Sequence, residues 1–306
     1  MDLAKILARV LDQPQVAKVM RVLDIYGHAA GGLLANGLAF SALFASIPAA
    51  LLVIGVGGFI AAGSAEAQQR LVDALIEAFP PLADLINGAV AAVSQGAALT
   101  SIIGFVGVIW TVSQFYGAID VAFARIFAAS PERDIVRRTA RGFLVVVLIG
   151  IAIVGFVVLV SAATYLDALI PTQIPVATAI VSVLRSVPFL MLLAIGVILA
   201  TYRFLPPNAP RWRSALIPAI VVGIVVVVLS QVFTLLVPRL VGVAALAGSL
   251  ASAFIALAWL SFTFQAILYG AAWVRVRDEL ADRAATDASA SLGGPAASAE
   301  PGGRGE

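Results

Sequence analysis

Long stretches without a charged residue are the feature that most constrains this chain. Phe143 to Leu166 and Ser214 to Val237 contain no charged side chain, and each exceeds the roughly 20 residues that a helix needs to cross a bilayer core. Of the 306 residues, 61% are hydrophobic and 12% are charged, whereas soluble globular domains carry roughly 25% charged residues. The sequence therefore predicts an integral membrane protein built from α-helices.

Six stretches have the length and hydrophobicity of transmembrane helices. The first contains Pro48, which removes an amide donor and predicts a bend. The fold class we expect is all-α, a polytopic membrane protein with six transmembrane helices. The expected spans are approximately residues 32–62, 99–127, 142–166, 178–204, 214–237 and 247–274.

Residues 64–96 differ from the spans because charged and amide side chains interrupt their apolar pattern. The apolar residues recur at helical spacing on both sides of Pro80 and Pro81, which fits two amphipathic helices broken at the prolines. We therefore expect an extracytoplasmic amphipathic helical hairpin after the first span. Envelope proteins, if they bind this chain, are expected to bind through this hairpin.

The two ends of the chain differ in composition from the expected membrane domain of residues 31–278. Residues 1–30 carry apolar side chains at helical spacing, which fits either an amphipathic helix at the inner membrane surface or a solvated helix packed on the membrane domain. No cleavable signal peptide is expected. Residues 279–306 are rich in Ala, Ser, Gly and Pro, and this composition predicts a disordered tail.

Basic residues are distributed unevenly between the two sides of the expected membrane domain. With six spans, 16 of the 19 lysines and arginines fall on the side that holds both termini, and three fall on the other. Because cytoplasmic loops carry the excess of Lys and Arg, both termini are expected in the cytoplasm. The net charge of +2 gives no indication of a nucleic-acid partner.

The chain offers few groups for catalysis or metal binding. It has no cysteine and one histidine, His28, which we expect to be a satisfied histidine at the membrane interface. No glycine-rich loop of the ATPase type is present. We therefore expect no enzymatic activity, catalytic residue, metal site or cofactor.

Polar side chains within the spans are the candidates for function. An unpaired polar group in the membrane costs about 1–3 kcal/mol, so these side chains are expected to face the protein interior. Two interpretations remain open: a hydrophilic path or head-group site, or interhelical hydrogen bonds worth roughly 0.6 kcal/mol each. Tyr202 and Trp259 are expected to anchor span ends at the interface. The candidates for the path are Asn36, Gln114, Asp120, Arg203 and Gln265.

Four short strings carry a family resemblance: Leu38-Ala39-Phe40 with Pro48, Gly104 to Trp110 with Thr111 and Ser113, Tyr202-Arg203-Phe204-Leu205-Pro206, and Tyr269-Gly270-Ala271. Together they resemble the YihY/BrkB family over roughly residues 20–278. The resemblance implies a six-helix protein of the bacterial inner membrane with a periplasmic segment after the first span.

Members of that family have carried three functional labels: serum-resistance factor, ribonuclease BN, and participant in transport of lipids or envelope components. A ribonuclease is physically implausible here because the scattered carboxylates and single histidine offer no two-metal centre. The sequence favours a transporter or flippase-like protein whose partners are membrane lipids. The alternative is a non-transporting scaffold for envelope assembly that acts through residues 64–96. The oligomeric state is not predicted.

Overall fold

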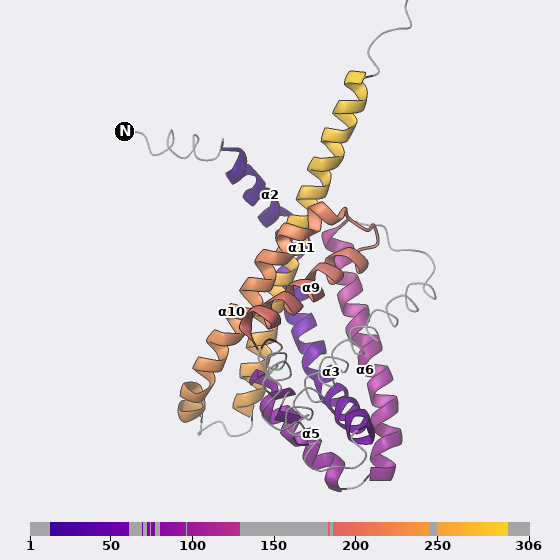
Figure 1. The fold of residues 1–306 in the computed structure, drawn as a ribbon, viewed down its shortest axis with the longest axis vertical. Coiled ribbons are helices and arrows are strands. Elements are labelled where there is room, and N and C mark those ends of the chain that lie inside the picture. The colour runs from indigo at the N-terminus through magenta and orange to yellow at the C-terminus, as the bar shows by residue number, and fades with distance from the viewer. Residues whose placement is uncertain are drawn as a thin grey trace, which may run out of the picture.

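The computed structural model describes residues 13–60, 69, 72–73, 75–76, 80–95, 97–128, 183, 186–244 and 250–292. All regular structure in these residues is helical, as the sequence predicts (Figure 1). The expected span at residues 142–166 lies outside them, as do residues 1–12, which carry the first apolar helical pattern. The helices are α2 (Pro14–His28), α3 (Gly31–Ile60), η1 (Pro80–Leu82), α5 (Ala83–Gln95), α6 (Ala97–Ile126), α9 (Val187–Phe204), α10 (Trp212–Ala244) and α11 (Leu250–Leu292).

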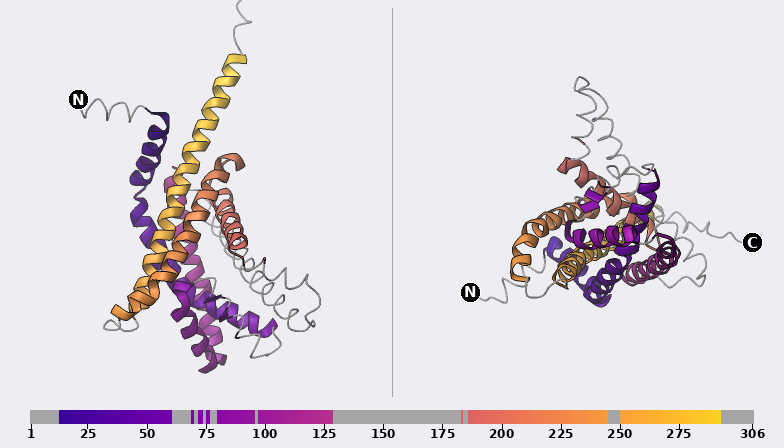
Figure 2. Two further views of the ribbon diagram at one scale, coloured as in Figure 1. Left: turned by 60° about the vertical axis from the view of Figure 1, so that its left-hand side comes forward. Right: turned by 90° about the horizontal axis from the view of Figure 1, so that it is seen from below.

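The long helices pack side by side around α11. Helix α3 lies between α6 and α11, and α10 lies between α11 and α9 (Figures 1 and 2). One end of the bundle collects the start of α3, the end of α6 and the short connection between α9 and α10. We call this the basic end, because Arg21, Arg211 and Arg275 lie there. Helix α5 lies at the opposite end.

Two helices in the described residues are long and apolar enough to cross a membrane, at Trp212–Leu236 and Ser252–Ser289. A third span results if α2 and α3 are taken together across the bend between them, as Gln15–His28 with Gly31–Ser46. Met191–Phe204 is a shorter apolar helix. These helices agree with a helical membrane protein, and the count of six spans stays a prediction.

The expected span at 178–204 is interrupted near its start. Helix α9 begins at Val187, after Ser186 in an extended conformation with ψ of 142°. The Ser186 hydroxyl accepts a hydrogen bond from the Phe189 amide at 3.4 Å, which is the usual interaction of an N-cap. Pro188 fits in the first helical turn because no helical amide bond is needed there.

A 60° bend separates α2 from α3. Ala30 occupies the left-handed region with φ of 55°, and its amide donates to the Gly27 carbonyl at 2.9 Å. This is the hydrogen bond expected where a left-handed residue ends a helix. The Tyr26 ring folds back against Gly31, where a Cβ atom would overlap it. The bend therefore places α2 against α11, with which it packs.

The helical hairpin at 64–96 is described in part, and the break expected at Pro80 and Pro81 is the 3-10 turn η1. Leu75 and Ile86, on the two sides of the break, are buried. The turn itself packs against α10 and α11, and α5 packs against α3. The described part of the hairpin's apolar side is therefore covered by the bundle, while polar residues such as Asp84 are exposed.

The final helix differs from the sequence prediction. Helix α11 continues to Leu292, although residues 279–306 are expected to be a disordered tail. Ion pairs account for part of the extension: Arg275 Nε lies 2.8 Å from Glu279 Oε1 one turn later, and Arg211 lies 2.8 Å from Asp282. Alanine, frequent in this segment, is also the best helix former. Residues 293–306 lie outside the described residues.

Two aromatic residues expected at the interface lie in the core instead. Tyr202 is fully buried, and its hydroxyl donates to the Ile267 carbonyl of α11 at 2.8 Å. Trp259 is 6% exposed, and its Nε1 donates to Ser230 Oγ at 3.2 Å. Buried Tyr and Trp usually satisfy their polar atom in this way. Both residues therefore join helices.

Candidate functional site

Three polar side chains meet where α3 packs against α11. Ser261 Oγ donates to Asn36 Oδ1 at 2.5 Å, and Gln265 Nε2 donates to Ser261 Oγ at 3.2 Å. Ser261 and Gln265 lie one turn apart on α11, so they share a face of that helix. We call Asn36, Ser261 and Gln265 the polar seam.

The polar seam opens towards the outside of the bundle. Asn36 is exposed, and Ser261 and Gln265 are half-buried. The residues around it on the same helices are apolar and exposed, among them Leu33, Phe40 and Phe262. The expectation that polar groups face the interior is therefore not met at Asn36. In the described residues, an exposed apolar surface therefore carries a short polar track.

An aromatic stack lies one helical turn beyond the polar seam, towards the basic end. Tyr269 is one turn beyond Gln265 on α11, and its ring stacks on Tyr26 of α2 with centroids 3.7 Å apart and planes 15° apart. Tyr269 is 37% exposed. Because Ser261, Gln265 and Tyr269 are spaced four residues apart, they form one stripe along α11. This stripe leads from the polar seam towards the basic end.

A charged cluster lies at the basic end. Arg21 of α2 and Arg275 of α11 both donate to the Glu279 carboxylate, and Arg275 also donates to the Ile126 carbonyl at the end of α6 at 2.6 Å. Burial on its own would raise the pKa of Glu279, but hydrogen bonds and charge from Arg275 and Arg21 lower that pKa below 4.5. The cluster ties α2, α6 and α11 together.

The other predicted path residues do not join the polar seam. Asp120 is 9% exposed on α6, whereas Gln114 is exposed on the same helix. Arg203, on α9, lies over the Trp212 ring at 5.6 Å from its centroid. Within the described residues, no hydrogen bond links Gln114 or Arg203 to Asn36 or Gln265. The structure thus brings together Asn36 and Gln265 of the five candidates.

Sequence reasoning missed Ser261, which bridges the two amides, and Tyr269 as a continuation of the stripe. The spacing of Ser261, Gln265 and Tyr269 is a signal that was available in the sequence. The hydrogen bond from Ser261 to Asn36 could not be predicted from the sequence, because it depends on how α3 and α11 pack.

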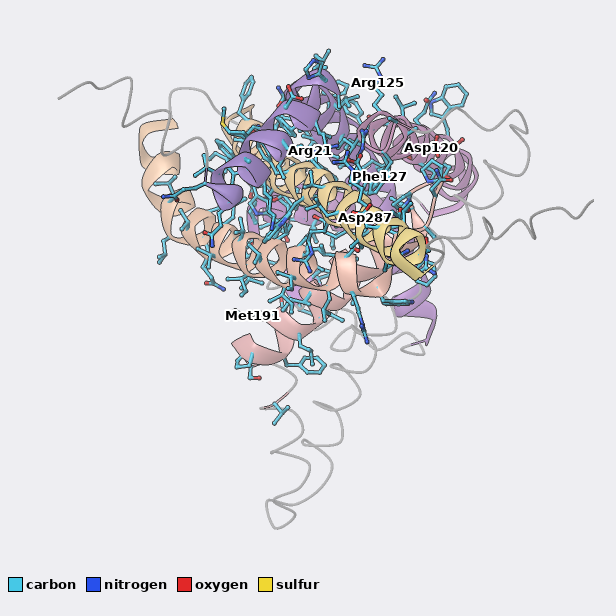
Figure 3. The ribbon with its side chains drawn as sticks, turned by 90° about the horizontal axis from the view of Figure 1, so that it is seen from above. Arg21, Asp120, Arg125, Phe127, Met191 and Asp287 are labelled. Carbon is cyan, nitrogen blue, oxygen red and sulfur yellow. The ribbon has the colours of Figure 1, made fainter. Side chains whose placement is uncertain are left out.

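His28, the one histidine of the chain, lies at the basic end. His28 Nδ1 lies 3.0 Å from Asp24 Oδ1, and both side chains are largely exposed. Figure 3 looks down on this end, where Arg125 points outward from α6. Among the described residues, no group of three His, Asp or Glu side chains is arranged to hold a metal ion. The polar seam supplies hydroxyl and amide groups, which suit hydrogen bonding to a polar head group.

Residues 22–292 match the protein family described as virulence factor BrkB. This chain belongs to the BrkB family. The match contains the polar seam, the Tyr26–Tyr269 stack and the charged cluster except for Arg21. It also confirms the resemblance inferred from the short strings, and with the apolar helices it identifies a BrkB-family integral membrane protein. No curated protein and no solved structure matches the chain.

Proposed function

We propose that this BrkB-family protein moves a lipid or another amphipathic envelope molecule between the leaflets of the bacterial inner membrane. The observation that supports this is the polar seam, which presents hydrogen-bonding groups on a membrane-facing surface. A head group moves along the polar seam while its acyl chains stay in the bilayer. Such a path needs no closed cavity, because the hydrocarbon part of the cargo never leaves lipid.

The depth of the polar seam suits this role. Ser261 lies 14 residues before Arg275, which corresponds to about 21 Å along a helix, and Gln265 lies about 15 Å from it. Since the hydrocarbon core is roughly 30 Å thick, the polar seam reaches into its middle. A head group in pure hydrocarbon loses its hydrogen bonds at a cost of several kcal/mol for each group. Asn36, Ser261 and Gln265 replace part of those bonds.

The proposed topology has six spans, with the basic end and both termini in the cytoplasm. It rests on the bias of arginine and lysine and on the arrangement of the described helices, which places α5 at the end away from Arg211 and Arg275. The charged cluster then stands at the cytoplasmic mouth of the path. Transport is driven by a gradient or by mass action, since the sequence has no ATPase-type phosphate loop.

The scaffold alternative acts through the hairpin at 64–96, and the apolar face of that hairpin is one surface that a partner can bind. Leu75 and Ile86 are buried and η1 packs on α10 and α11, so the described part of that face is already used within the chain. The exposed polar side, with Asp73 and Asp84, is the part of the hairpin still able to meet a partner. The scaffold alternative is therefore left with the polar side of the hairpin, whereas the polar seam supports the transport proposal.

Transport is tested with purified protein in liposomes that contain a fluorescent phospholipid, whose outer-leaflet copies are bleached by an impermeant reductant. We expect the wild-type protein to expose the inner-leaflet copies faster than empty liposomes do. Replacing both amides of the polar seam, Asn36→Leu with Gln265→Leu, is expected to slow this exchange about tenfold or more, because the central hydrogen-bonding groups are lost.

The matched control is Gln231→Leu, which removes an exposed glutamine from α10, away from the polar seam. We expect it to keep the wild-type rate. Equal loss in the control and in the double variant would show that the polar seam is not the path. Wild-type protein that is folded yet no faster than empty liposomes would refute lipid exchange and favour the scaffold.

A further inference from the structure

A second group of arginines surrounds the connection between α9 and α10. Arg203 lies in the last turn of α9, Arg211 and Arg213 flank the first residue of α10, and Arg277 reaches them from α11. The contacts converge on the first turn of α10: Arg203 lies 5.6 Å from the Trp212 ring centroid, and Arg277 Nη2 donates to the Arg213 carbonyl at 3.3 Å.

The positive charge of this group is only partly balanced. Arg211 pairs with Asp282 at 2.8 Å, and its amide donates to Asp278 at 3.0 Å. Four arginines and two aspartates leave a net charge of +2. In the part of the chain that the structure describes, Arg203, Arg213 and Arg277 form no ion pair. The Nε atoms of Arg203 and Arg277 are buried and have no hydrogen-bond partner there.

This arrangement contrasts with the charged cluster of Arg21, Arg275 and Glu279. There, Arg21 and Arg275 share the Glu279 carboxylate, so their charge is matched by a group in the chain. A buried donor that stays unpaired costs about 1–3 kcal/mol. The unmatched guanidinium groups therefore point to an acceptor that the described residues do not supply.

The surface beside the arginines is apolar and aromatic. Phe204 and Trp212 are more than half exposed, and their rings meet edge to face with centroids 6.3 Å apart. Trp is enriched at the boundary between head groups and hydrocarbon. A ligand at this place would contact the guanidinium groups with a polar part and the aromatic rings with an apolar part. A membrane lipid has both parts, a polar head group and apolar acyl chains.

We propose that Arg203, Arg213 and Arg277 bind the phosphate of an anionic phospholipid in the leaflet at the basic end. The part of its acyl chains nearest the head group then packs against Phe204 and Trp212. A planar guanidinium fork suits phosphate oxygens better than the point charge of lysine does. The site is separate from the polar seam, and binding here does not require that the protein transport lipid.

The test uses the full-length protein, delipidated in detergent and titrated by native mass spectrometry with phosphatidylglycerol or with phosphatidylcholine of the same chains. We expect the wild-type protein to bind phosphatidylglycerol at least tenfold more tightly. Arg203→Gln with Arg277→Gln is expected to weaken that binding about tenfold or more, as charged hydrogen bonds are lost. The matched control is Arg125→Gln with Arg283→Gln, which removes two exposed arginines and should keep wild-type affinity.

Two results would overturn the proposal. Equal weakening in the control pair would show attraction to surface charge in general. Displacement of the lipid by millimolar inorganic phosphate would show a free-phosphate site. If the glutamine variant fails to fold, Arg203→Lys with Arg277→Lys decides the question, because it keeps the charge. We expect it to bind several-fold more weakly than the wild type, and wild-type affinity in that variant would contradict a site built from guanidinium forks.

Discussion

At the scale of single residues, Tyr202 and Gly270 show how the family strings act in this chain. Tyr202, from the string Tyr-Arg-Phe-Leu-Pro, is buried between helices. Gly270, from the string Tyr-Gly-Ala, has no side chain and so leaves space for the Tyr202 hydroxyl. A Cβ atom on Gly270 would overlap that hydroxyl and lie 2.6 Å from Val222 Cγ2. The two strings therefore specify one three-helix contact between α9, α10 and α11.

Gly270→Ala is expected to destabilise the protein by about 1–3 kcal/mol, because the added methyl group overfills this contact. The measurement is the thermal midpoint of the purified protein in detergent. Gly117→Ala is the matched control, since a Cβ atom there meets nothing within 4 Å, and we expect it to change the midpoint little.

Tyr202→Phe removes the overlapping hydroxyl and a hydrogen bond worth roughly 0.6 kcal/mol. Combined with Gly270→Ala, it is expected to cost less than the two single changes added together. Strict additivity in this double-mutant cycle would mean that the two side chains do not compete for the same space.

At the scale of helices, Glu279 joins α2 to α11 through its ion pair with Arg21. The folded protein holds the Glu279 pKa below its usual value of 4.5, so the ionised form stabilises the folded state. This stabilisation is complete above pH 4.5, and it is lost as the pH falls through the lowered pKa of the folded state. The bend at Ala30 brings Arg21 to this carboxylate.

We expect the thermal midpoint of the wild-type protein to fall more steeply below pH 4.5 than that of Glu279→Gln, which has no carboxylate to protonate. The measurement is a series of melts between pH 3 and pH 7. Asp84→Asn, at an exposed position of α5, is the control and should follow the wild-type curve. Parallel curves for the wild type and Glu279→Gln would show that the cluster does not link folding to pH in this range.

At the scale of the whole molecule, the absence of cysteine makes the proposed topology easy to test. Single cysteines introduced as Arg213→Cys at the basic end and Asp84→Cys in α5 are expected to react with an impermeant maleimide from opposite sides of the membrane. Arg213→Cys should react from the cytoplasmic side, following the positive-inside rule. Reaction of both variants from the same side would contradict the proposed arrangement.

The sequence predicts the elements of this molecule better than their contacts. Charge-free stretches locate α10 and most of α3, α6 and α11, because hydrophobicity and length decide membrane insertion. The helical structure at the end of α11 was not predicted, because it depends in part on ion pairs of Glu279 and Asp282 with arginines distant in the sequence. The sequence predicts Asn36 and Gln265 as separate candidates. It does not predict the polar seam that they form through Ser261, because the seam depends on how α3 and α11 pack.

The most direct test of the proposed path is a density map of the protein in lipid nanodiscs, inspected beside Asn36, Ser261 and Gln265. The account predicts ordered lipid or water along the polar seam, with a head group between these side chains and the Tyr26–Tyr269 stack. A polar seam covered by another helix, or packed dry against its neighbours, would contradict the proposed path and leave its hydrogen bonds as links between α3 and α11.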